Sequence, residues 1–400
     1  MTERLYYRDS YLTDFRARVV DASPDRQRVY LDRTAFYPTS GGQPFDTGLL
    51  HKSNVIEVVD EGDRIAHVLS EPLTLDEMDG RVDRERRFDH MQQHSGQHLL
   101  SAVLLEMFDA PTVSFHLGAE SSSIDIARLL EPAQLREAER RVNEIVFENR
   151  PVTISFQQSS ENLDLRKPTE REGEVRIISI EGLDRSACGG THVSSTGEIG
   201  PILLRKLDRV RGNLRIEFVC GGRAIARARA DFEALSQIAR LFSAPLDGTP
   251  ALVDAQREKL QESDRTRRQL ATELAQATGR VLYAETPPGP DGVRRILRRA
   301  ESISEELRAE AQSFTAAGPA ILLAISENPP SVLLAVSKDS AVHAGDLLKR
   351  VLAGAGGRGG GNAVLAQGSL PSKESLEQLA RSLTSDLSFP PLALGQLSAK

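Results

Sequence analysis

The spacing of apolar and polar positions changes several times along the chain, and each change indicates a different kind of element. In residues 1–88, stretches such as RARVVDA and HKSNVIEVVDEGDRIAHVLS alternate apolar with polar positions, which is typical of strands with one buried face. From residue 89 to about Phe108, and again in EPAQLREAERRVNEIVFENR, apolar residues recur at helical spacing. The strand-like stretches VTISFQQ, EVRIISI and LRIEFV follow. We therefore predict a small β-barrel over residues 1–88 and an α+β domain over residues 89–222.

The second half of the chain changes pattern twice more. Residues 223–285 contain two helical stretches separated by SAPLDGTP, and the second is charged almost all round, as in an exposed or coiled-coil helix. After TPPGPDG, the apolar strands AILLAIS and SVLLAVS alternate with the helical stretches SISEELRAEAQSF and AGDLLKRVLAG. We predict a helical connector over residues 223–285 and a small α/β domain over residues 286–400, so that the whole is an α+β multidomain protein.

Composition limits the class of protein. The chain has 400 residues, 40% of them hydrophobic, which is enough for two or three domains with their own cores. No apolar run reaches the roughly 18 residues that a membrane-spanning helix needs, and the N-terminus lacks the apolar centre of a signal peptide. Cys188 and Cys220 are too few for a disulfide framework. We expect a cytoplasmic protein with free thiols.

Two short motifs carry the residue types of a metal site. His94 and His98 stand four residues apart in the first predicted helix, which places them on one face, one turn apart. In ACGGTH, Cys188 and His192 have C-x₃-H spacing, and the glycines allow the loop to fold tightly. Three imidazoles and one thiolate form a set that favours zinc. We predict a zinc site from these four residues; the alternative is a buried structural thiol and ordinary surface histidines.

Charge is distributed unevenly. The net charge of −7 argues against a nucleic-acid-binding surface over the whole protein, but residues 204–232, LRKLDRVRGNLRIEFVCGGRAIARARADF, are strongly basic. This stripe could contact phosphates, or it could be the solvated face of a strand and a helix. The run GGRGGG at 356–361 could cradle phosphates, or it could be a loop whose glycines relieve backbone strain. It lacks the Lys-Ser/Thr ending of a nucleotide-hydrolase loop.

Several stretches resemble a known family. HSGQHLLSA and SACGGTHV, preceded by FYPTSGGQPFDTG, are similar to the editing domain of alanyl-tRNA synthetases and of their free-standing relatives, the AlaX proteins. The likeness continues through GEIGPILLRKLDRVRGNLRIEFVCGGRA, and GGRGGGNAVLAQG resembles the C-terminal DHHA1 domain of those synthetases. Because the chain begins at the barrel, we expect no aminoacylation domain. The likeness is to the long form of AlaX, over nearly all of the chain.

The resemblance implies a function: hydrolysis of the ester that joins a wrong amino acid, serine or glycine, to the tRNA specific for alanine. Such editing is needed because an apolar pocket discriminates between amino acids that differ by one small group by only about 1–3 kcal/mol. The resemblance also implies that the four predicted ligands hold Zn²⁺ and that Gln43 belongs to a substrate-facing glycine-rich motif. Polar candidates for the substrate pocket are Thr34, Gln43, Thr112, Ser114 and His116. Candidate tRNA contacts are Arg205, Lys206, Arg209, Arg211 and Arg358.

The role of the zinc and the catalytic activity stay open from the sequence. Four protein ligands make a closed zinc site, which is usually structural, whereas catalytic zinc keeps an open position. The ion could bind water, bind the substrate amino group, or only shape the pocket. The alternative function is a non-catalytic tRNA-binding protein with a structural zinc. We further expect residues 223–400 to serve tRNA capture or assembly of a homodimer rather than chemistry.

Overall fold

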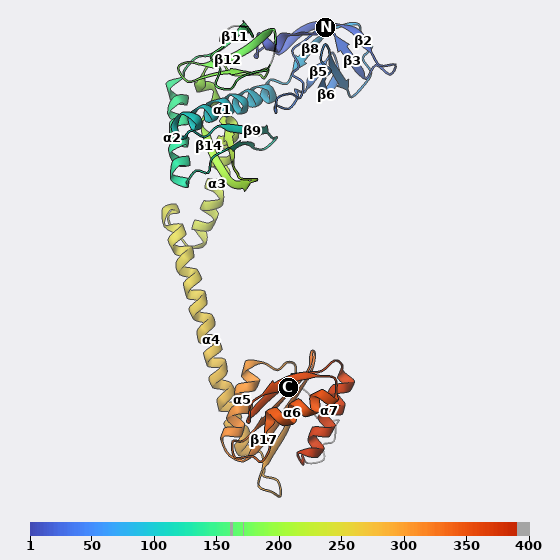
Figure 1. The fold of residues 1–400 in the computed structure, drawn as a ribbon, viewed down its shortest axis with the longest axis vertical. Coiled ribbons are helices and arrows are strands. Elements are labelled where there is room, and N and C mark those ends of the chain that lie inside the picture. The colour runs from blue at the N-terminus through green and yellow to red at the C-terminus, as the bar shows by residue number, and fades with distance from the viewer. Residues whose placement is uncertain (161–162, 171, 390–400) are drawn as a thin grey trace. The chain divides into compact units, whose positions relative to one another are not determined.

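A computed structural model describes residues 1–160, 163–170 and 172–389 (Figure 1). The chain divides into two compact units, Met1–Ser243 and Ala244–Lys400, and each is described by itself. None of the helices in the described part of the chain combines the length and the apolar character that a membrane span requires.

The first unit begins with a closed β-barrel, as the alternating pattern predicts. Its strands follow the order β2-β3-β7-β6-β5-β8 around the barrel. Their bounds are β2 (Asp14–Ala22), β3 (Arg28–Leu31), β5 (Gly48–Leu50), β6 (Ser53–Asp60), β7 (Ile65–Leu69) and β8 (Glu77–Val82). The short elements β1 (Glu3–Arg4), η1 (Leu5–Tyr7) and β4 (Arg33–Thr34) accompany them. Alternate apolar positions fill the interior, among them Phe15, Val29, Leu50, Val55 and Ile65.

Among the described residues, three α-helices pack with two sheets to form the rest of the first unit. Helix α1 (Arg84–Phe108) begins earlier than the predicted residue 89, because the Asp83 side chain accepts the backbone N–H groups of Glu85 and Arg86. The two sheets have the orders β14-β15-β10-β9 and β11-β12-β13. The remaining bounds are β9 (Thr112–Leu117), β10 (Ser122–Ile126), α2 (Pro132–Glu148), β11 (Val152–Gln158), β12 (Glu174–Ile180), β13 (Asp184–Ala187), η2 (Thr196–Ile199), β14 (Ile202–Val210), β15 (Asn213–Cys220) and α3 (Gly221–Leu241).

Arg87, in the first turn of α1, ties this helix to the barrel. Its guanidinium is buried against the carboxylate of Asp46, with Nε 3.1 Å from Oδ2, and its Nη1 donates to the Ser10 carbonyl at 2.8 Å. Loss of either partner of such a buried ion pair is strongly destabilising. The pair therefore fixes the direction in which α1 leaves the barrel. The histidine face of α1 is thereby held beside the barrel turn that contains Gln43.

The second unit contains an α/β domain, as predicted, with helices on both faces of a mixed sheet, and it also includes helix α4 from the predicted connector. Its elements are η3 (Leu246–Gly248), α4 (Thr249–Glu285), β16 (Arg294–Ala300), α5 (Glu305–Ala316), β17 (Ala320–Glu327), β18 (Pro330–Val336), α6 (Ala344–Gly354), β19 (Arg358–Gly361), β20 (Leu365–Ser369) and α7 (Lys373–Asp386). The sheet order is β16-β17-β18-β20-β19. One face packs against α5 and the end of α4, and the other face packs against α6 and α7.

The GGRGGG run is a strand, which neither sequence interpretation anticipated. Its last four residues form β19 at the edge of the sheet, and α6 packs across it. A Cβ at Gly359 would lie 2.6 Å from a methyl group of Leu352 and 2.4 Å from the Gln367 carbonyl oxygen. The glycine is therefore needed for close approach of a helix and a neighbouring strand.

Candidate metal centre and its pocket

Helix α1 and the loop after β13 bring the four predicted ligands together. The ligand atoms of His94, His98, Cys188 and His192 all lie within 4.8 Å of one another. The Nε2 atoms of His94 and His192 lie 3.4 and 3.3 Å from Sγ of Cys188. The two motifs, distant in sequence, thus form one cluster that could hold a metal ion.

Each imidazole uses its Nδ1 for a neighbouring side chain. The three pairs are His94 with Oε1 of Gln43 at 2.8 Å, His98 with Oδ2 of Asp184 at 3.2 Å, and His192 with Oγ of Ser95 at 3.1 Å. An amide oxygen and a carboxylate only accept, so Nδ1 carries the proton in His94 and His98. Nε2 is then the ring nitrogen directed at the cluster, which is the arrangement of metal-binding histidines.

The members of the cluster differ in how readily they hold a proton. Burial opposes ionisation of the Cys188 thiol, but the imidazoles of His94 and His192 outweigh it and lower the pKa of Cys188 well below its ordinary value. Burial lowers the pKa of His192 to about 3, so this ring is neutral at pH 7. Against burial, hydrogen bonds to Asp184 and Cys188 raise the pKa of His98 to about 9. A metal must therefore displace a proton from His98, and its affinity falls at low pH.

Arg176, on β12, shapes the loop that carries Cys188. Its Nη1 donates to the carbonyls of Cys188 and Gly190 at 2.7 and 2.9 Å, and its Nε donates to the Tyr7 carbonyl. The sequence analysis did not single out Arg176 or Asp184. Asp184 has a positional signal, because it lies four residues before Cys188 at the start of β13. Arg176 has none, because one buried arginine in a strand resembles any other.

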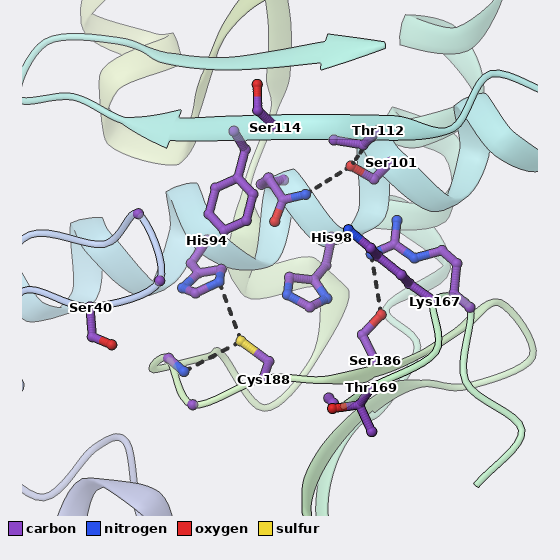
Figure 2. Close-up of a pocket in the computed structure, with 18 of the residues that line it drawn as sticks. Ser40, His94, His98, Ser101, Thr112, Ser114, Lys167, Thr169, Ser186 and Cys188 are labelled. Atoms are coloured by element: carbon purple, nitrogen blue, oxygen red, sulfur yellow. Dashed lines mark hydrogen bonds between the residues drawn. The ribbon is translucent and has the colours of Figure 1, made fainter. Parts of the chain in front are cut away.

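A pocket of about 810 Å³ opens beside the cluster, lined by residues that include His94, His98 and Cys188. Ser40, Gly41 and Gly42 of a barrel turn line one part of it. Figure 2 shows His94, His98 and Cys188 pointing toward one another, with Lys167, Thr169 and Ser186 along a further side. The N₃S donor set, its tautomers and the adjacent space are together suited to zinc and a small ligand.

The predicted polar residues have different positions. Thr112 lines the pocket, and its Oγ1 donates to Oγ of Ser101 at 2.8 Å. Ser114 reaches the pocket edge, but it donates to Asp125 at 2.8 Å and points away from the imidazoles (Figure 2). His116 is exposed and is not among the described residues that line the pocket. Phe115 lies against His94. Because successive strand residues face opposite sides of the sheet, the side chains of Ser114 and His116 point away from the His94 ring.

Two candidates from the barrel are fully buried. Gln43 follows the turn at Gly41 and Gly42, which both have positive φ, and its amide binds His94 and Thr191 rather than lining the pocket. Thr34 lies inside the barrel, 2.8 Å from Nε2 of His67. Gln43 thus positions a candidate ligand, whereas Thr34 is not among the described residues that line the pocket.

Gln97 is a pocket residue that the sequence analysis missed. It is 3% exposed, lines the pocket, and precedes His98 on α1. The available signal was its place between the two histidines, in HSGQH.

The basic candidates are partly engaged by acids. Arg205 pairs with Asp231, and Nζ of Lys206 lies 2.8 Å from Asp208. Arg209 and Arg211, at the exposed end of the β14–β15 hairpin, have no ion pair within the described ranges. Arg358 is exposed on β19 of the second unit. Exposed ion pairs are weak, so a phosphate can compete for all of these cations.

Known families match two parts of the chain. Residues 175–217 match the family described as threonyl and alanyl tRNA synthetase second additional domain. Residues 304–388 match the DHHA1 domain. The first match covers the loop with Cys188 and His192, and the second covers most of the second unit.

Individual proteins match over a longer range. The chain is 32% identical over 401 residues to the alanyl-tRNA editing protein AlaX-L of Pyrococcus horikoshii, covering 93% of this chain and 96% of that protein. It is 30% identical over 404 residues to the alanine-tRNA ligase of Pyrococcus abyssi, covering 96% of this chain but 44% of the ligase. Among solved structures, the C-Ala domain of the alanyl-tRNA synthetase of Aquifex aeolicus matches 24% of this chain and 90% of that domain, with 25% identity and a TM-score of 0.21. The chain thus spans nearly all of the editing protein and less than half of the ligase.

Proposed function

The chain belongs to the AlaX-L family of alanyl-tRNA editing proteins, and from this premise we propose that it hydrolyses the ester between serine or glycine and tRNA specific for alanine. The observation that carries the proposal is the cluster of three imidazoles and one thiol within 4.8 Å, beside a pocket of about 810 Å³. Such a pocket is large enough for an aminoacyl group together with part of the terminal nucleotide.

His94, His98, Cys188 and His192 would hold a zinc ion in this proposal. When bound, the ion supplies positive charge that polarises an ester carbonyl or lowers the pKa of a water to about 7. The chain's own residues orient the site: Gln43 and Asp184 fix two imidazoles through Nδ1. Removing a side chain that hydrogen-bonds to a metal ligand commonly lowers metal affinity or activity by roughly 10- to 100-fold.

Other pocket residues would bind the tRNA end. Lys167 is exposed and lines the pocket, and Arg4 lines it from the barrel side. Cations beside a substrate pocket attract the phosphates of a polyanion. We place the amino acid next to His94 and His98 and the phosphate chain toward these two cations.

The second unit would capture tRNA or join two copies of the chain. On α4, Val253, Leu260, Leu274 and Val281 are 45%, 63%, 69% and 55% exposed. They recur at multiples of seven positions, which is the spacing of one seam position in a coiled coil. This apolar stripe on α4 supports assembly, and exposed Arg358 on β19 supports RNA contact.

Deacylation assays test the proposal. Wild-type protein should release serine or glycine from mischarged tRNA specific for alanine and should spare the alanyl form. Cys188→Ala should lose stoichiometric zinc and more than about 100-fold of the rate, since even an outer partner of a metal ligand contributes roughly 10- to 100-fold. Cys220→Ala is the matched control, because Cys220 is the other free thiol and lies outside the cluster.

The outcomes separate the elements of the proposal. Equal rates on seryl and alanyl tRNA in the wild type would contradict editing. Full deacylation by metal-free Cys188→Ala would contradict a role of the metal in the reaction, but not the reaction itself. Binding of tRNA without deacylation would favour a non-catalytic protein with a structural zinc.

A further inference from the structure

The amide oxygen of Gln97 is a buried acceptor with no donor. The side chain lines the pocket and is 3% exposed, yet Oε1 has no hydrogen-bond partner among the described residues. Buried polar atoms of this kind are nearly always satisfied in folded proteins, because leaving one unpaired is destabilising. An unpaired atom on a residue that lines a pocket indicates that a ligand supplies the partner.

The orientation of this amide is fixed by its own nitrogen. Nε2 of Gln97 donates to Oγ of Ser101 at 2.8 Å, one turn along α1. Thr112, on β9, donates to the same Oγ at 2.8 Å. Figure 2 shows Ser101 and Thr112 side by side near His98. Both donors are therefore directed at Ser101, and this wall of the pocket offers acceptor oxygens to a ligand.

The proposed function adds a requirement that size cannot meet. An editing site that attacks serine must spare alanine, which is smaller and enters any space that serine can occupy. Discrimination must then come from the serine hydroxyl itself. A site built to hydrogen-bond a hydroxyl rejects the analogue lacking it by up to roughly 10⁴-fold, because the buried group of the site is left unpaired.

We propose that Oε1 of Gln97 accepts a hydrogen bond from the side-chain hydroxyl of the seryl ester and thereby sets the preference for serine over alanine. This inference rests on the proposed function and names the residue that recognises the serine hydroxyl of the substrate. The position suits the role, because Gln97 immediately precedes His98 on α1, beside the metal cluster. Alanine offers no donor to this oxygen.

Substitutions at two positions test the assignment. Gln97→Met keeps the length of the side chain and removes the acceptor, whereas Gln97→Glu keeps an acceptor. Thr112→Val is the matched control, because it removes a hydroxyl from the same wall and leaves Oε1 of Gln97 in place. For each protein, kcat/KM is measured on seryl, glycyl and alanyl tRNA specific for alanine, together with the bound zinc per chain.

We expect Gln97→Met to lose more than about tenfold in kcat/KM on the seryl ester and less than about twofold on the glycyl ester, with zinc unchanged. Gln97→Glu and Thr112→Val should keep most of the preference for serine. Equal losses on seryl and glycyl esters would overturn the inference, because the amide would then serve the common α-amino group or the fold. So would loss of the preference in Thr112→Val alone. Absence of seryl deacylation in the wild type would instead refute the proposed function.

A binding measurement makes the test independent of how well the variants fold. The wild type should bind the non-hydrolysable seryl amide of 3′-aminoadenosine at least about tenfold more tightly than the alanyl amide. Gln97→Glu should retain this difference. Equal affinities of the wild type for the two amides would overturn the assignment even if seryl tRNA is deacylated.

Discussion

Gly190, in the loop after β13, lies directly against His94 of α1. A Cβ built there would lie 2.1 Å from Cε1 and 2.3 Å from Nδ1 of His94. At the neighbouring Gly189, the nearest atom to an added Cβ is Oη of Tyr7 at 3.5 Å, which is ordinary contact. A methyl group therefore fits at Gly189, whereas at Gly190 it would overlap the His94 ring.

We predict that Gly190→Ala displaces the His94 ring and lowers zinc affinity by at least about tenfold, the lower range for disturbing the support of a ligand. Competition with a chromophoric chelator measures this affinity. Gly189→Ala is the control and should bind zinc like the wild type. Unchanged affinity in a folded Gly190→Ala protein would mean that His94 contributes nothing to metal binding.

Single residues also show where sequence reasoning stops. The H-x₃-H and C-x₃-H spacings suffice to predict that four side chains converge, since helix geometry and a glycine loop constrain them locally. The contact of Gln43 with His94 joins residues 51 positions apart and depends on the anchoring of α1 to the barrel. The role of Gln97 depends on its Oε1 having no partner among the described residues of the folded protein, which no local pattern encodes.

Among the elements, the barrel carries a buried titratable group that takes no part in the candidate metal site. His67, on β7, is fully buried, with Nε2 2.8 Å from the hydroxyl of Thr34. Burial lowers the pKa of His67 to about 4. Between pH 6.5 and about 4 the unfolded chain therefore binds a proton that the folded barrel excludes, and the free energy of unfolding falls as the pH drops through this window.

We predict that His67→Gln reduces the loss of stability between pH 7 and pH 5. At pH 5, which is about 1.5 units below the ordinary pKa of histidine, His67 lowers the free energy of unfolding of the wild type by about 2 kcal/mol. For a unit of this size, that loss lowers Tm by roughly 5 °C. Thermal unfolding at the two pH values measures the difference within each protein, so any cost of the substitution at pH 7 cancels. His90, whose burial also lowers its pKa to about 4, is present in both proteins.

His51→Gln supplies the control, because His51 is exposed in the same barrel. It should show the same decrease in Tm as the wild type. An equal decrease in His67→Gln would mean that His67 is protonated in the folded barrel.

The element types follow largely from the sequence, and the exceptions have physical causes. Alternation predicts the barrel strands because each has one face in a closed core. β19 was missed because glycine has low strand propensity, and only the packing of α6 explains its use there. β16 was missed because its arginines interrupt the apolar pattern expected of a strand. In the structure, Arg295 and Arg299 form ion pairs with acidic residues.

At the level of the whole molecule, the structural boundary falls within the predicted connector. The sequence groups α3 with α4, because both are charged helices, but the compact units separate between Ser243 and Ala244. Helix α3 stays with the first unit through Arg223, whose Nη2 lies 2.6 Å from Asp89 of α1. No feature of the helical pattern distinguishes a helix that packs back on its own unit from one that leaves it.

This boundary leads to a prediction about a protein truncated after Ser243. It should retain stoichiometric zinc and a kcat within about threefold of the full chain, because every candidate ligand and every described pocket-lining residue lies before the cut. Its KM for tRNA should rise by at least about tenfold, since contacts with several phosphates each add to affinity. If α4 joins two copies, sedimentation should also show loss of the dimer.

A protein truncated after Gly222 provides the comparison. It lacks α3 and the Arg223–Asp89 pair, so its Tm should be lower than that of the longer form. Loss of zinc and of deacylation in a well-folded protein ending at Ser243 would show that the second unit contributes to the chemistry.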